Sequence, residues 1–129
     1  MKKLLFILAA TFLLSCSSDN EDEEPKTPSN EEMIIGKWVK FEQSSASSYP
    51  IFYDAFSKDT LTFRQDGTYT EIFEGSKSPI NGTYTISYTR LVLGGLFLYD
   101  LIFDNYETMI LKGYGLGDDN TISKYKRLQ

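Results

Sequence analysis

Apolar and polar residues alternate in short runs along most of the chain from Gly36 to Leu128, and turn-forming residues separate the runs. Alternation with a period of two is typical of strands that bury one face. After a short helical turn at 31–35, the pattern predicts strands at 36–43, 60–64, 68–74, 82–88, 90–93, 97–103, 106–112 and 121–128. The connections at 65–67, 94–95 and 104–105 are tight, so consecutive strands are expected to pair as an antiparallel meander.

The hairpin around Gly67 indicates which residues face the core. A three-residue loop with Gly67 in a left-handed bulge position sets Phe63 opposite Tyr69 and separates the apolar residues from the threonines. In this register Glu71 points inward as a charged exception. The same alternation predicts an inward row of aromatic side chains, namely Phe63, Tyr69, Phe73, Tyr84, Tyr88, Phe97, Tyr99 and Phe103.

The first 32 residues follow a different pattern. Lys2 and Lys3 precede an apolar run from Leu4 to Leu14 that is too short for a bilayer, which takes roughly 20 residues, so 1–15 are expected to be a cleaved signal peptide. Residues 16–32 carry seven acidic side chains, one lysine and two prolines, which predicts a disordered acidic tether. One folded domain, at 33–129, remains.

The segment Leu13-Leu14-Ser15-Cys16 closes the apolar run and contains the one cysteine of the chain. It resembles the lipobox of bacterial lipoproteins, which implies that Cys16 becomes the lipidated first residue of the mature protein. Each buried acyl methylene, for example of palmitate, contributes roughly 0.8 kcal/mol, so Cys16 is expected to anchor the domain to a membrane. The acidic run that follows resembles the surface-export signals of lipoproteins in the Bacteroidetes, and it fits a plain solvated spacer equally well.

Charge and composition exclude several functions. The formal net charge of −5 lies mostly in the tether, because residues 33–129 hold eleven acidic and ten basic side chains, and we expect no nucleic-acid partner. The chain has no histidine and its one cysteine is assigned to lipid, which removes the usual nucleophile systems and zinc sites. We therefore expect no enzyme, no cofactor and no metal site. A carboxylate-dependent hydrolase would need a second inward acid beside Glu71.

Four short segments resemble a known family. They are Gly36-Lys37-Trp38, residues 61–63 with 66–70, Gly82-Thr83-Tyr84 and Tyr125-Lys126-Arg127. Together they are similar to the lipocalin-like lipoprotein domains of the Bacteroidetes. The resemblance implies an eight-stranded up-and-down barrel on an outer-membrane lipoprotein of the cell envelope, with an interior that is filled or holds one small ligand. It also implies that Trp38 plugs one end of the barrel and that Arg127 stacks on it, a structural contact worth about 0.5 to 2 kcal/mol.

Two functions fit these features. In the first, the barrel binds a small apolar or amphipathic ligand beneath a lid in which a short helix shows Phe52 and Phe56 on one side. The ligand would touch Phe63, Tyr69, Glu71, Phe73, Tyr84, Tyr99, Phe52 and Phe56, with a cavity among Tyr69, Tyr84 and Tyr99. Glu71 would receive a polar ligand group or pair with Arg127 or Arg90.

In the second function, a filled barrel binds another cell-envelope protein without catalysis. The candidate surface is an apolar patch at Leu96, Leu98 and Ile102. This patch is free for a partner only if the turn with Met33, Ile34 and Ile35 does not cover it, and we expect that turn to cover it.

Overall fold

The computed structural model describes residues 26–45, 50–114 and 121–129, which form one short helix and nine strands. The helix α1 spans Asn30–Ile34. The strands are β1 (Gly36–Ser45), β2 (Tyr53–Asp54), β3 (Thr60–Phe63), β4 (Thr68–Ile72), β5 (Ile80–Ser87), β6 (Arg90–Leu93), β7 (Phe97–Asn105), β8 (Thr108–Tyr114) and β9 (Thr121–Leu128).

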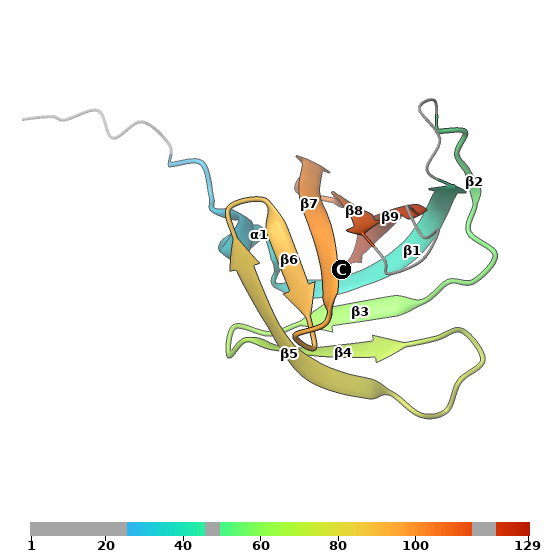
Figure 1. Cartoon of the computed structure of the whole chain (residues 1–129), viewed down its shortest axis with the longest axis horizontal. Helices are drawn as coiled ribbons and strands as arrows, with labels where there is room; N and C mark the ends of the chain where they lie inside the picture. The colour runs from blue at the N-terminus through green and yellow to red at the C-terminus, as the bar shows by residue number, and fades with distance from the viewer. Residues whose placement is uncertain (1–25, 46–49, 115–120) are drawn as a thin grey trace, which may run out of the picture.

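Eight strands close into an antiparallel up-and-down barrel, which confirms the predicted all-β fold and is compatible with a lipocalin-like architecture (Figure 1). Each strand from β3 to β9 pairs with the one before it in the order β1-β3-β4-β5-β6-β7-β8-β9, and β9 returns to pair with β1. The two-residue β2 pairs with β1 at Glu42 and Gln43, beyond the part that β3 covers. Since the strands alternate in direction, their connections alternate between the end that carries α1 and the far end (Figure 1).

The predicted register of the first hairpin is confirmed. Phe63 pairs with Tyr69, and Gly67 has a φ of +80°, a conformation that glycine adopts without a steric penalty. The Asp66 carboxylate accepts a hydrogen bond of 3.0 Å from the Thr68 amide and so holds the turn. Glu71 pairs with Leu61 and therefore shares the inward face, as predicted.

The turn predicted at Asp104-Asn105 is wrong by two residues. β7 continues to Asn105, and the chain reverses at Tyr106 and Glu107 instead. The Asn105 side chain accepts a hydrogen bond of 2.8 Å from the Glu107 amide, so its role is to begin the turn from the end of the strand.

The buried core takes side chains from α1 and from every strand of the closed barrel except β5. It consists of Ile34, Trp38, Leu61, Phe63, Tyr69, Leu91, Leu93, Leu101, Met109, Leu111 and Tyr125, with Ile35, Tyr84, Ile86, Tyr99 and Phe103 packed against it. Three residues of the predicted inward row lie outside this core. Tyr88 is 92% exposed in a turn with a φ of 57°, and Phe73 and Phe97 are exposed at strand ends. Strict alternation fails there because the chain leaves the barrel wall.

The predicted cover of the outer apolar patch is also wrong. Ile34 is fully buried in the core, so α1 turns into the barrel end and leaves the outer surface uncovered. Leu96 is 85% exposed and Ile102 is 49% exposed. The patch is therefore accessible in the described part of the chain.

Gly82 lies where β5 leaves β4 and turns toward β6. A Cβ at this position would lie 2.7 Å from Cε1 of Tyr69 and 3.1 Å from Cζ of the same ring. Because the Tyr69 ring is buried, we expect Gly82→Ala to lower the free energy of unfolding by about 1 to 3 kcal/mol in urea unfolding. Thr83→Ala, on the exposed side of the same strand, is the control. Equal stability of the two variants would contradict the close packing at Gly82.

Candidate functional site

α1 begins with a capping box at Ser29. The Ser29 hydroxyl accepts a hydrogen bond from the Glu32 amide, and the Glu32 carboxylate accepts one of 2.8 Å from the Ser29 amide. These bonds satisfy amides that a helix leaves free at its first turn. The Asn30 side chain also donates to the Tyr88 carbonyl at 2.8 Å, which ties α1 to the β5–β6 turn.

Trp38 and Arg127 close the barrel at the α1 end. The Trp38 indole nitrogen donates to the Ile34 carbonyl at 2.8 Å, and the Arg127 guanidinium carbon lies 4.3 Å from the centroid of the Trp38 ring. Arg127 also donates to the carbonyls of Met33 at 2.5 Å, Ile35 at 2.6 Å and Tyr106 at 2.9 Å. The predicted stacking is therefore present, and the same side chain fastens the carbonyl end of the helix, which the sequence did not indicate.

A groove of about 600 Å³ lies between α1 and β5. The pairing of β4 with β5 stops at Thr83, so the second half of β5 extends past the start of β4 at this end of the barrel. The groove lies beside that half. Its lining residues are Glu31, Glu32, Ile35, Gln65, Tyr84, Thr85 and Ile86, and we call it the α1 groove.

Tyr84 belongs to the predicted ligand set and lines the α1 groove. Its hydroxyl donates to the Arg64 carbonyl at 2.7 Å, and its ring meets the Phe63 ring edge-on with centroids 5.1 Å apart. The ring is therefore fixed as one wall of the groove. The other lining residues were not predicted as ligand contacts, although the helical turn predicted at 31–35 contains Glu31, Glu32 and Ile35.

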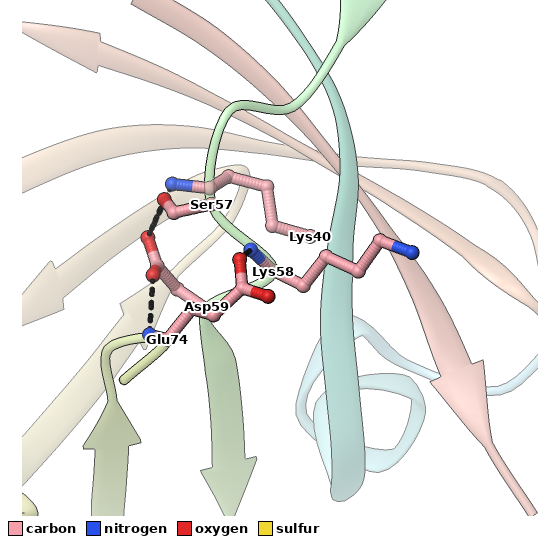
Figure 2. Close-up of polar contacts among 5 residues, drawn as sticks. All are labelled: Lys40, Ser57, Lys58, Asp59 and Glu74. Carbon is pink, nitrogen blue, oxygen red and sulfur yellow. Dashed lines mark hydrogen bonds and ion pairs between the residues drawn. The ribbon is translucent and has the colours of Figure 1, made fainter. Parts of the chain in front are cut away.

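The Asp59 carboxylate is buried and accepts three hydrogen bonds (Figure 2). It accepts hydrogen bonds from Lys40 Nζ at 2.5 Å, Ser57 Oγ at 2.9 Å and the Glu74 amide at 3.1 Å. Burial alone would raise the pKa of Asp59, but these hydrogen bonds and the Lys40 charge hold it below its ordinary value. Sequence reasoning missed this pair, although Lys40 lies two residues after the inward Trp38 and Asp59 lies two before the inward Leu61.

Glu71 faces the same interior. Burial raises the pKa of Glu71, the nearby Asp59 charge raises it further, and Lys40 lowers it. The suggested pairing with Arg127 or Arg90 is wrong, because Arg127 binds carbonyls at the α1 end and Arg90 is exposed. The charged form of Glu71 is therefore destabilised in the barrel, mainly because burial removes water from its carboxylate.

This cost predicts a pH dependence of stability. A carboxyl whose pKa is raised by folding binds its proton more tightly in the folded state, so stability rises as the pH falls through that raised pKa and levels off near the ordinary value of 4.5. We expect Glu71→Gln to be more stable than the unmodified chain at pH 7, with a difference that shrinks toward pH 4.5. Urea unfolding across this range measures it, with the exposed Glu107→Gln as control. If the free energies of unfolding of Glu71→Gln and the unmodified chain differed by the same amount at every pH, the raised pKa of Glu71 would be contradicted.

The remaining predicted ligand residues do not form one site. Phe63 and Tyr69 are buried in the core, Tyr99 is packed against it, and Phe73 is exposed at the end of β4. The helix predicted for 52–56 is absent, since Tyr53 and Asp54 form β2. The centroid of the Phe52 ring instead lies 3.8 Å from Lys124 Nζ, and Phe56 is 86% exposed. The Lys124 ammonium thus holds the Phe52 ring in a cation–π contact, and Phe52 and Phe56 do not form the predicted lid.

Other predictions are not tested by this geometry. Cys16, the signal peptide and most of the tether lie outside the described residues. Within the described residues, no group of three or more acidic, histidine or cysteine side chains could hold a metal ion. The same residues contain no helix of the length and hydropathy needed to cross a membrane.

Comparison with known proteins adds no family. No protein-family model matches the chain, and no curated protein matches its sequence. The barrel and its α1 groove therefore carry the functional argument.

Proposed function

We propose that this chain is a non-catalytic binding protein of the cell envelope, a lipocalin-like lipoprotein held at the outer membrane by lipid on Cys16, and that it binds one small amphipathic molecule in the α1 groove. The observation that carries the proposal is the groove itself. Its volume of about 600 Å³ lies within the ~300 to 1,000 Å³ that is usual for small-molecule sites. Such sites combine an apolar lining with a few polar groups.

The lining of the α1 groove has this composition. Ile35, Ile86 and the Tyr84 ring supply apolar surface, and Gln65 and Thr85 supply neutral polar groups. By contrast, large core side chains such as Leu91, Leu101 and Met109 occupy the barrel interior. This contrast supports a site beside the barrel wall in place of the one first expected among Tyr69, Tyr84 and Tyr99.

Native mass spectrometry of the purified full chain, before and after organic extraction, tests the proposal. We expect an adduct that extraction removes, and rebinding of an apolar fluorescent probe to the extracted protein. Thr85→Trp should fill the groove and reduce probe binding, whereas Thr83→Trp, also exposed on β5 but outside the lining, should not. A bare mass together with no probe binding would refute the proposal.

The second candidate is an interaction module that binds another envelope protein. The exposure of Leu96, beside the start of β7, and of Ile102, on β7, favours it, since a partner protein can bury accessible apolar side chains. Leu96→Glu with Ile102→Glu should then abolish binding to a partner found by crosslinking in intact cells and leave the fluorescent-probe binding unchanged. Retention of the crosslinked partner by this variant would exclude the patch.

A further inference from the structure

The charged residues that line the α1 groove are all acidic. Glu31 and Glu32 come from the first turn of α1, and none of the other five lining residues carries a charge. An apolar groove with carboxylates at its edge differs from a simple hydrophobic pocket, because it attracts cations and repels anions. The groove therefore has a charge preference as well as a shape.

No basic side chain of the described residues neutralises these two carboxylates. The ion pairs in these parts of the chain join Lys40 to Asp59 and Lys124 to Glu42. Arg127 lies near α1, but its guanidinium donates to three backbone carbonyls. The carboxylates are thus available to a bound molecule.

The capping box keeps one of these carboxylates in a defined place. One oxygen of Glu32, Oε2, accepts the hydrogen bond from the Ser29 amide, which leaves Oε1 for another donor. Glu31, the neighbouring residue, takes no part in the capping box. An ammonium group has several hydrogens to donate and can satisfy both side chains.

The apolar wall suits the rest of such a molecule. The Tyr84 hydroxyl is already bonded to the Arg64 carbonyl, so this residue offers the groove its ring and not a further polar group. An alkyl chain can pack on Ile35 and Ile86, and the face of an aromatic ring attracts a cation. We infer that the α1 groove selects an amphipathic organic cation, an ammonium group on an apolar chain; this inference rests on the proposed use of the groove for ligand binding.

Three probes that share a dodecyl chain test the inference on the purified full chain. They are dodecylammonium, dodecyl maltoside and dodecanoate, each titrated below its micelle concentration by calorimetry. We expect the ammonium to bind roughly three- to tenfold more tightly than the neutral probe at low salt, as two partly exposed charge contacts permit, and dodecanoate to bind most weakly. The preference should shrink at high salt, which screens exposed charges.

Substitution of both acids separates charge from folding. Glu31→Gln with Glu32→Gln should remove the preference for the ammonium probe, and glutamine at position 32 retains the capping box. Glu107→Gln, an exposed acid at the same end of the barrel and outside the groove, should leave the preference unchanged.

Two results would overturn the inference in different ways. If all three probes bind alike and Thr85→Trp weakens them equally, the groove is a ligand site without charge selection, and only the inference fails. If none of the three binds, the proposed function fails and the inference fails with it.

Discussion

Trp38→Ala is expected to lower the free energy of unfolding by about 3 to 5 kcal/mol. Trp38 is fully buried, its ring contacts the Arg127 guanidinium and the Phe103 ring, and its indole nitrogen donates a hydrogen bond to the Ile34 carbonyl. The substitution opens a cavity at the α1 end and frees the helix that forms one side of the α1 groove. Since small domains are stable by only about 5 to 15 kcal/mol, this is a large share of the total.

Urea unfolding followed by circular dichroism measures this loss. Trp38→Phe keeps most of the packing and removes the hydrogen bond, so it should cost less than the alanine variant. Val39→Ala, on the neighbouring outward-facing position of β1, is the control and should have a small effect. A loss below 1 kcal/mol for Trp38→Ala would show that this end of the barrel is not closed by Trp38.

Lys40→Met is expected to cost about 3 to 5 kcal/mol, because it leaves the buried Asp59 carboxylate without its counter-charge. The side chains of Lys40 and Asp59 are only 13% and 6% exposed. Substituting both residues, as Lys40→Met with Asp59→Leu, should cost less than the sum of the single changes, since no buried charge is then left alone.

The Lys124–Glu42 pair supplies a matched control on the barrel surface. Its side chains are 26% and 32% exposed, so Glu42→Gln, which keeps the contact of Lys124 with the Phe52 ring, should cost about 1 kcal/mol or less. Equal costs for the Lys40 and Glu42 variants would contradict the importance of burial.

The Asp59 pKa is lowered by folding, so its contribution to stability is present above the ordinary value of 3.8 and is lost as the pH falls through the lowered pKa.

The strand pattern was predictable because its causes are local. The bounds of β6 and β9 were predicted to the residue, and the pairing of Phe63 with Tyr69 followed from the left-handed position of Gly67. Errors occur where a strand ends. The Asn105 side chain, at the last position of β7, accepts a hydrogen bond from the Glu107 amide in the turn. The neighbouring residues do not show whether Asp104 or Asn105 will make this bond.

Part of the charged interior could be predicted from the sequence. Counting in steps of two from Trp38 and Leu61 places Lys40 and Asp59 on the inward face, and the same rule placed Glu71 there correctly. What alternation does not show is that Lys40 Nζ and the Asp59 carboxylate meet across neighbouring strands, since that requires the pairing of β1 with β3.

The sequence by itself determined most of the strand faces, the tight turns to within two residues, and the lack of histidine for catalysis or metal binding, because each depends on residue type and on near neighbours. The tertiary structure decided which distant residues meet. The α1 groove exists because β4 pairs with β5 only as far as Thr83 and because Arg127 and Trp38 hold α1 at the end of the barrel. These contacts depend on the closure of β9 onto β1, and the free energy of that closure is shared by the whole barrel and belongs to no single segment.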